Sequence, residues 1–370
     1  MPQPQAHERI LLGPGPSLIA PRVMRALATP MLSHLDPDFV AIMDDVRARL
    51  GRVFKAPEGA FAFAVSGTGT AGMETAVANL VAPDTRVLSV VTGYFADRLA
   101  QMCTRYGGVV TRVEAEWGRA IDPELVRRAL TDSGADLVTA VHAETSTGVL
   151  NPVREIAALA HQHGALVIVD AVTSLGGMPL DVAGWGLDAV YSCSQKCLGS
   201  PSGVAPIVFS PRALERKVTC RSFYLDLALL EDYWVRRKYH HTMSASLIFA
   251  LREALTAVEE EGLDARWARH ERNHRALASG LSAMGLSLLP PEADRLWTLN
   301  AIAVPPGVDD AVVRKYLLQR FNMEIGAGLG PLAGKVFRVG LMGTSSSPEL
   351  VDLLLQALSE ALASPDVRKA

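Results

Sequence analysis

Three polar features of this sequence each follow a short apolar run, which is where a parallel sheet presents residues to a ligand. The first is the glycine- and hydroxyl-rich segment 66–72, Ser-Gly-Thr-Gly-Thr-Ala-Gly, ahead of a helical pattern. The second is Asp170, which ends the run LVIVD, and the third is Lys196 in SCSQKCLG. Lys196 is exceptional among the seven lysines because small residues flank it just beyond an apolar run. Such a setting favours a depressed pKa and Schiff-base chemistry.

Together these features predict a site for pyridoxal phosphate. Free amides at a helix start, with hydroxyls nearby, bind a phosphate group. An acid can keep a pyridinium nitrogen protonated, and an amine can form a Schiff base with the cofactor. Each feature alone also fits an ordinary role, namely a tight strand-to-helix turn, a turn cap and a solvated loop lysine.

The glycines of the first segment leave an alternative from another class of enzyme. Gly67, Gly69 and Gly72 satisfy G-x-G-x-x-G, which is the fingerprint of nicotinamide-dependent oxidoreductases when an acid ends the next strand. Here the run 86–91 leads into Thr92 and Gly93 instead. A non-catalytic binding protein is a further alternative, but that reading leaves Lys196 and Asp170 without a role.

The elements that must position these residues alternate along the chain. From about residue 36 to 295, apolar runs alternate with helical patterns, which predicts a mostly parallel sheet with helices on both faces. Asp36 and Pro37 are the predicted cap and first residue of a helix. The interval between Asp170 and Ala189 is too rich in glycine for a packed helix, so we expect a loop there. The predicted strands are 61–65, 86–91, 109–113, 137–142, 166–170, 189–193 and 205–209.

The pattern changes near the pair Pro290–Pro291. After it, the sequence alternates more quickly between strand and helix signals, which predicts a small C-terminal α/β domain. We therefore expect an N-terminal arm over 1–35, a large cofactor-binding domain over 36–289 and a small domain over 290–370. The predicted class is α/β, with a doubly wound sheet in the large domain.

Composition restricts the partners. The 370 residues are 49% hydrophobic and carry a formal net charge of -3, which favours neither a nucleic-acid-binding surface nor disorder. We find neither a signal peptide nor a membrane-spanning run. The four cysteines are too irregularly spaced for disulfides or a metal site, so we expect free thiols in a cytoplasmic protein without metal. We therefore expect the partner of this protein to be a small molecule.

Six segments resemble the class V aminotransferases of the alanine–glyoxylate and serine–pyruvate group. They are SGTGTAGMETA, HAETSTGVLNP, VDAVTSLGG, SQKCLGSPSG, KYHHT and GLGPLAGKVFRVGLMG, and the likeness runs from Leu11 to about Ala361. The resemblance implies a fold-type I pyridoxal-phosphate transferase in which Lys196 is the Schiff-base lysine and Asp170 pairs with the pyridinium nitrogen. It further implies that the remaining cofactor contacts come from Thr68, Gly69, Thr70, Phe95, Thr145, Val172 and Gln195, with Phe95 stacked on the ring.

The same resemblance implies a homodimer with composite sites. Tyr239 and Thr242 match residues that reach the phosphate of the neighbouring subunit's cofactor, and Arg338 matches the arginine that binds the substrate carboxylate. From the residues alone, an ordinary basic loop is the preferred interpretation of the segment with Tyr239 and Thr242, and Arg338 fits a surface ion pair equally well. The implied reaction moves the amino group of alanine or serine to glyoxylate or pyruvate.

Two other branches of the family are alternatives. Ureidoglycine–glyoxylate aminotransferases have similar HGETSTG and QKCL segments, but that branch carries amide residues at the positions of Tyr239 and near His34. Cysteine desulfurases require a cysteine on a mobile loop near the site, and no cysteine here lies in a matching loop.

Overall fold

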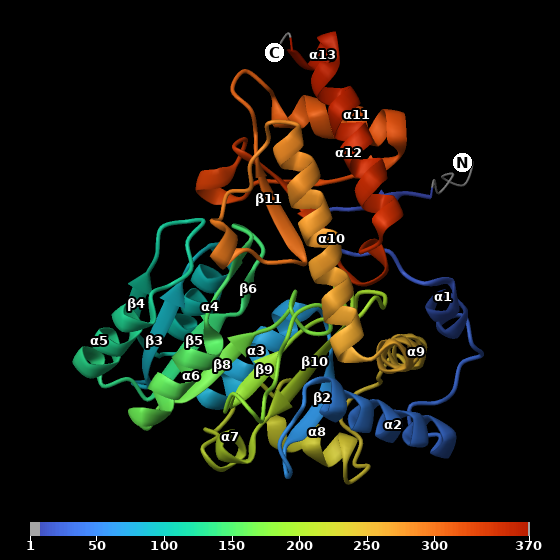
Figure 1. The fold of residues 1–370 in the computed structure, drawn as a ribbon. Helices are drawn as coiled ribbons and strands as arrows, with labels where there is room; N and C mark the ends of the chain where they lie inside the picture. Colours follow the sequence, from blue (N-terminus) through green and yellow to red (C-terminus); the bar gives the residue numbers. More distant parts are fainter. Residues whose placement is uncertain (1–7, 369–370) are drawn as a thin grey trace.

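A seven-stranded mixed sheet is the largest element of the fold (Figure 1). The computed structural model describes residues 8–368, so residues 1–7 of the predicted arm and 369–370 of the predicted small domain lie outside the described residues. The strand order is β2-β10-β9-β8-β5-β3-β4. Only β10 runs antiparallel to its neighbours, which agrees with the predicted mostly parallel sheet. The strands are β2 Phe61–Ser66, β3 Arg86–Val91, β4 Val109–Glu114, β5 Leu137–Val141, β8 Leu166–Asp170, β9 Ala189–Tyr191 and β10 Val204–Phe209.

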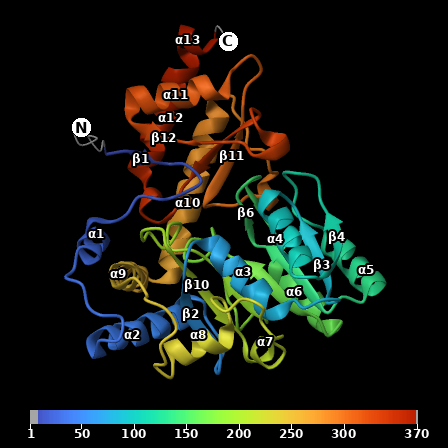
Figure 2. The same ribbon diagram turned by 180° about the vertical axis from the view of Figure 1, so that it is seen from behind.

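Helices cover both faces of this sheet (Figures 1 and 2). The predicted start of the first long helix is confirmed, because the Asp36 side chain accepts a hydrogen bond from the Asp38 amide and Pro37 is the first helical residue. No helix interrupts the interval between Asp170 and Ala189, as expected. The helices are α1 Pro21–Leu27, α2 Pro37–Val53, α3 Gly69–Leu80, α4 Tyr94–Arg105, α5 Pro123–Ser133, α6 Val153–Gln162, α7 Pro211–Glu215, α8 Leu227–Trp234 and α9 Ala245–Glu261.

The central strands are buried on both faces, whereas one of the two edge strands, β4, is not. Residues of β5, β8, β9 and β10 are all buried. The edge strand β4 is mostly exposed, with Val109 55% exposed. Its Thr-Arg-Val-Glu composition suits an edge that has only one neighbouring strand. A short hairpin, β6 Ala143–Glu144 and β7 Val149–Leu150, follows β5 beyond the carboxyl edge of the sheet.

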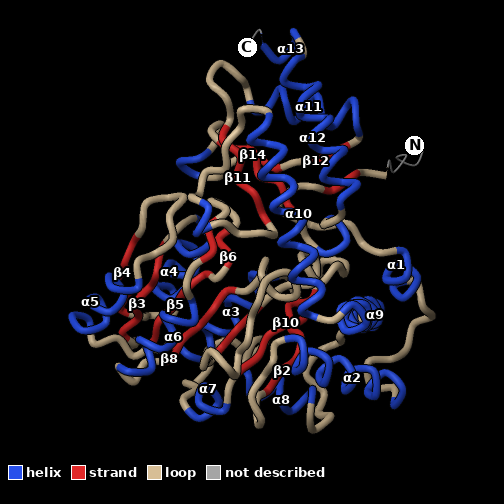
Figure 3. Tube along the Cα trace, in the orientation of Figure 1, coloured by secondary structure: helices blue, strands red, loops and turns tan. Residues whose placement is uncertain are grey.

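A second, smaller sheet lies above the first in Figure 3. It contains β11 Leu299–Ala303, β14 Val336–Gly340 and β13 Gly326–Ala327, with antiparallel pairing. Strand β1 Ile10–Leu11 pairs in parallel with β12 Met323–Glu324. The helices of this part of the chain are α10 Leu263–Ala283, α11 Asp310–Phe321, α12 Pro348–Ala363 and α13 Pro365–Arg368. Its short 3₁₀ turns are Glu292–Asp294, Gly330–Leu332 and Gly343–Ser345.

The apolar core around the smaller sheet includes residues from distant parts of the chain. Leu12 and the α10 residues Leu277 and Leu281 belong to it, although they precede residue 290. The predicted division of the chain at 289/290 stays a prediction.

Candidate active site

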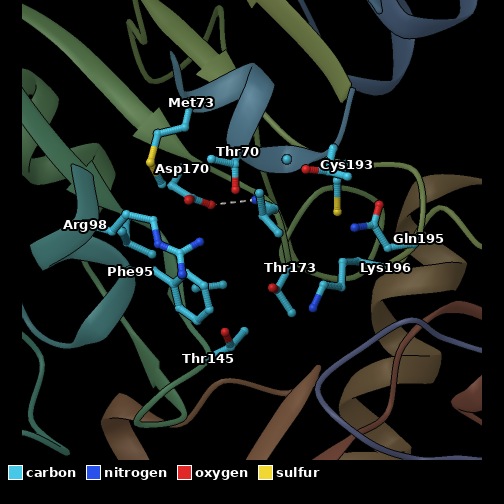
Figure 4. A pocket seen from close by; sticks show the side chains of 15 residues that line it. Thr70, Met73, Phe95, Arg98, Thr145, Asp170, Thr173, Cys193, Gln195 and Lys196 are labelled. Carbon is cyan, nitrogen blue, oxygen red and sulfur yellow. Dashed lines mark hydrogen bonds between the residues drawn. The ribbon is translucent and has the colours of Figure 1, made fainter. Parts of the chain in front are cut away.

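A cavity of about 170 Å³ opens where the parallel strands end (Figure 4). Because the carboxyl ends of β3, β5, β8 and β9 meet at one edge, residues far apart in the sequence converge there. The predicted site residues that line it are Thr68, Gly69, Thr70, Phe95, Thr145, Asp170, Val172, Gln195 and Lys196. The cavity is also lined by Met73, Arg98, Val141, Ala143, Thr173 and Cys193, for which the sequence predicted no role.

The glycine-rich segment forms the turn into α3. Thr68 is the residue before the helix, and its side chain makes no capping bond, so the first-turn amides are not occupied by a cap. A Cβ on Gly69 would lie 3.1 Å from Val172 Cγ2 and 3.3 Å from Cys193 Cβ, so glycine permits the close approach of this turn to the sheet. Nearby, the buried amide oxygen Oε1 of Gln195 has no hydrogen-bond partner among the described residues. The uncapped backbone amides of this turn and the hydroxyls of Thr68 and Thr70 are donors that suit an anion.

Asp170 ends β8 and is buried. One carboxylate oxygen accepts a hydrogen bond from the Val172 amide at 2.8 Å, and the other accepts one from the Tyr191 hydroxyl, also at 2.8 Å. Burial nevertheless raises the pKa of Asp170 to about 6, because these two bonds replace only part of the lost hydration. A cationic N–H group in the cavity would stabilise the charged carboxylate.

Lys196 lies in the turn after β9, facing the N-terminal segment. Its Nζ donates a hydrogen bond to the Pro14 carbonyl, and Ser17 Oγ donates one to the Lys196 carbonyl at 2.8 Å. Burial lowers the pKa of Lys196. Gly15 has φ +114°, and a Cβ there would lie 2.6 Å from Lys196 Cδ, so the segment can pass this close only as glycine.

The buried side chain of Arg266 forms hydrogen bonds with the backbone next to Lys196. Arg266 donates to the Gly176 carbonyl at 3.0 Å and to the Cys197 carbonyl at 2.6 Å. The Cys197 thiol donates to the Thr173 carbonyl at 3.1 Å. The loop 171–188 and the Lys196 turn are therefore tied together, which limits the motion of the lysine backbone.

Arg338 lies on β14 and is 7% exposed. Its Nε donates to the Ala327 carbonyl at 2.6 Å and its Nη1 to the Thr145 carbonyl at 3.3 Å. Within residues 8–368 no carboxylate forms an ion pair with it. Burial lowers the pKa of Arg338 to about 10, so it stays cationic at neutral pH. A buried guanidinium without an anionic partner can bind a carboxylate.

The segment with Tyr239 and Thr242 lies outside the cavity of its own chain. Tyr239 is 63% exposed, and its ring centroid is 5.4 Å from that of His34. Thr242 is also exposed. The roles assigned to these two residues from the resemblance, like those of the cavity residues, stay predictions.

Sequence reasoning missed two charged residues near the cavity. Arg98 is one turn along α4 from Phe95, and its guanidinium lies 5.2 Å from the ring centroids of both Tyr94 and Phe95. Glu144 lies between the lining residues Ala143 and Thr145 and is fully buried. A charged residue inside the otherwise polar HAETSTG motif was the available signal for Glu144. For Arg98, the only signal in the sequence was its position one helical turn after Phe95.

The described part of the chain has neither a metal-binding cluster nor a membrane-spanning helix. Between residues 8 and 368, no three His, Cys, Asp or Glu side chains are grouped closely enough to hold a metal ion. No helix in this range has the length and apolar character to cross a bilayer. The four cysteines are free, and three of them are buried.

Comparison with known proteins identifies the class to which this fold and site belong. The Aminotransferase class-V family profile matches residues 18–343. The (S)-ureidoglycine–glyoxylate transaminase of Bacillus subtilis is 37% identical over 96% of this chain and 90% of its own length. The alanine–glyoxylate aminotransferase of Drosophila melanogaster is 38% identical, covering 96% and 93%. The crystal structure of an alanine–glyoxylate aminotransferase from Nostoc sp. superposes with a TM-score of 0.94 at 44% identity, covering 98% and 97% of the two chains.

The chain belongs to the class-V aminotransferase family, and it is an aminotransferase. The predicted α/β fold of the fold-type I transferases is confirmed by the structural match and by the large mixed sheet.

Proposed function

We propose that this enzyme uses pyridoxal phosphate to move the amino group of alanine or serine to glyoxylate or pyruvate. The observation that carries the proposal is the convergence of Lys196, Asp170 and the Thr68–Thr70 turn on one cavity. When bound, the cofactor would supply an electron sink for the bond-breaking step at the substrate α-carbon.

The chain offers a residue for each part of the cofactor. Thr68, Gly69, Thr70 and Gln195 would hold the phosphate, which fits the uncapped helix start, the threonine hydroxyls and the donor NH2 group of Gln195. Asp170 would face the pyridinium nitrogen, whose charge offsets the burial of the carboxylate. The other contacts would come from Phe95, Val172 and Thr145.

Lys196 would anchor the cofactor and move the proton. Because burial lowers the pKa of its amine, a larger fraction of this amine is unprotonated near neutral pH than in an exposed lysine. The unprotonated amine could then take the proton from the substrate α-carbon and deliver it to the cofactor carbon. The bonds from Arg266 to the turn would hold the amine in place between these transfers.

Arg338 supports a substrate with one carboxylate. It is buried, none of the described carboxylates forms an ion pair with it, and a dicarboxylic donor would need a second cation. Arg98, unlike Arg338, is among the residues that line the cavity, but its guanidinium packs over the Tyr94 and Phe95 rings. We therefore infer that alanine and serine are preferred to glutamate and aspartate.

We also propose a homodimer in which Tyr239 and Thr242 complete the partner's site. The exposed face near them is rich in aromatic groups: Phe223, 73% exposed, stacks on His240, and Tyr224 lies against His241. Met31 is 71% exposed. Exposed apolar groups gathered in this way are typical of an interface. The free thiols support our expectation of a cytoplasmic compartment.

The test compares kcat/KM for alanine, serine, glutamate, aspartate and ureidoglycine with glyoxylate as the fixed acceptor. We expect alanine or serine to rank first and Arg338→Gln to raise KM for both. If glutamate or aspartate ranks first and Arg98→Gln abolishes that preference, the single-carboxylate pocket is wrong. If ureidoglycine ranks first, the assignment moves to that branch of the family. A protein that binds no pyridoxal phosphate would refute the proposal as a whole.

A further inference from the structure

The first turn of α4, which carries Phe95 into the cavity, has no cap of its own. Gly93 precedes the helix and offers no side chain to the exposed amides. A helix start within a protein interior requires acceptors for these amides. They come from the turn 144–146, about fifty residues further along the chain.

Glu144 and Ser146 bind three consecutive amides of α4. Ser146 Oγ accepts from the Tyr94 amide at 2.9 Å, and Glu144 Oε2 accepts from the Ala96 amide at 3.0 Å. Glu144 Oε1 accepts from the Phe95 amide at 3.5 Å. A carboxylate at a helix N-terminus also interacts favourably with the helix dipole.

The approach of the two segments depends on Gly93. A Cβ at this position would lie 2.6 Å from Glu144 Cγ and 2.7 Å from its Cδ, too close for any real side chain. The glycine that leaves α4 uncapped is therefore the residue that admits the Glu144 carboxylate to its amides.

The same turn is tied internally and to Arg338. Glu144 Oε1 accepts from the Ser146 amide at 3.0 Å and from Ser146 Oγ at 2.6 Å. Thr145, between them, lines the cavity, and its carbonyl accepts from Arg338 Nη1 at 3.3 Å. Glu144 is also the charged group that raises the pKa of Arg338 against the effect of burial.

We infer that Glu144 is a positioning residue that sets the Phe95 ring and the Arg338 guanidinium at once, by clamping the start of α4 to the turn 144–146. Its side chain is not among the groups that line the cavity, so it acts through Phe95, Thr145 and Arg338. The inference rests on the proposed function only for the identity of what Phe95 and Arg338 hold. The clamp itself is a property of the protein without cofactor.

The decisive variant is Glu144→Gln, which keeps the shape of the side chain but removes its charge and replaces one acceptor oxygen by a donor. The matched control is Glu74→Gln. Glu74 lies on α3 and accepts a bond at 3.0 Å from the hydroxyl of Tyr106, which is at the opposite end of α4 from the first turn. Hydrogen exchange of the peptide covering 92–100 is measured by mass spectrometry on the cofactor-free proteins. Affinity for pyridoxal phosphate is measured by titration, and KM and kcat are measured with alanine and glyoxylate.

We expect Glu144→Gln to exchange the first-turn amides roughly fivefold to tenfold faster, the effect of losing a helix cap. Its affinity for pyridoxal phosphate should fall by a similar factor. KM for alanine should rise more than kcat falls, because Arg338 is displaced while Lys196 is not. Glu74→Gln should match the wild type in all three measurements.

The inference is overturned if Glu144→Gln matches the wild type within about twofold in exchange and affinity, or if Glu74→Gln shows equal changes. If Glu144→Gln does not fold, Ser146→Ala replaces it. That variant removes the Tyr94 cap and the bond from Ser146 Oγ to Glu144 Oε1 but keeps the Glu144 carboxylate, and unchanged exchange at this turn would then refute the clamp. A wild-type protein that binds no pyridoxal phosphate would refute the proposed function, whereas the exchange result would still decide the role of Glu144.

Discussion

Replacing Asp170 with Asn should stabilise the cofactor-free protein at neutral pH, although it removes a residue that we place at the cofactor. Asp170 is buried, and burial raises its pKa from the ordinary 3.8 to about 6. The folded protein therefore binds the Asp170 proton more tightly than the unfolded chain does. An Asn side chain can keep both hydrogen bonds, since its oxygen can accept from Val172 and its amide can donate to the Tyr191 oxygen.

The magnitude and its pH window follow from the two pKa values. Below pH 3.8 the carboxyl is protonated in both states, and its burial brings no charge penalty. Between pH 3.8 and about 6 only the folded state keeps the proton, so stability falls as the pH rises. Above that window the penalty is constant, with an upper estimate of about 3 kcal/mol. Asp170→Asn should gain up to this amount at pH 7.5 and almost none near pH 4.

Urea unfolding midpoints of the cofactor-free proteins at pH 4 and pH 7.5 provide the assay. Asp188→Asn is the matched control, because Asp188 is also buried but pairs with Arg212 at 2.8 Å and His161 at 3.0 Å. Removing its charge leaves the Arg212 guanidinium without its counter-charge and should destabilise the protein. The reasoning is refuted if Asp170→Asn is less stable than wild type at pH 7.5, or if its gain is equal at both pH values.

Three further predictions concern Lys196, the N-terminal segment and the dimer. Lys196→Ala should fold and lose amino transfer, and near-normal turnover would contradict its assignment. Gly15→Ala would bring a Cβ within 2.6 Å of Lys196 Cδ, so the lysine must retreat by roughly 0.8 Å, a displacement that can cost on the order of 10²-fold in rate. Gly285→Ala, at φ +74° with no neighbour within 4 Å, should keep its rate and lose only about 1 kcal/mol of stability; equal rates for both variants would refute this account. Tyr239→Phe should weaken retention of pyridoxal phosphate, and dilution of the wild type should do the same; a monomer that retains the cofactor in size-exclusion and absorbance measurements would exclude the composite site.

Local patterns in the sequence were sufficient for the main elements of the fold. The Asp36-Pro37 cap, the apolar runs and the glycine-rich interval after Asp170 each reflect interactions between neighbouring residues, and the structure has the corresponding elements. Strand ends in a parallel sheet meet at one edge, so the positions of Asp170 and Lys196 just beyond apolar runs also predicted that they would share a cavity.

The structure differs from these expectations where strands meet particular neighbours. The pattern did not distinguish the exposed edge strand β4 from the buried strands, because exposure depends on what the rest of the fold packs against a strand: the other edge strand, β2, is mostly buried. Nor did it specify that β10 is antiparallel, because the connection after β9, residues 192–203, is long enough for either direction.

The sequence by itself determined the element order and the chemistry of the residues at the strand ends, because both depend on neighbours along the chain. Only the tertiary structure placed Gly15 against Lys196, Leu12 in the second core and Glu144 at the start of α4. Each of these contacts joins segments that are tens to hundreds of residues apart in the sequence. Periodicity and cap motifs involve only neighbouring residues, so they do not predict such contacts. Glu144 is the clearest example: it is an ordinary acidic residue in the sequence, and its role exists only because folding brings it to a helix start that Gly93 leaves open.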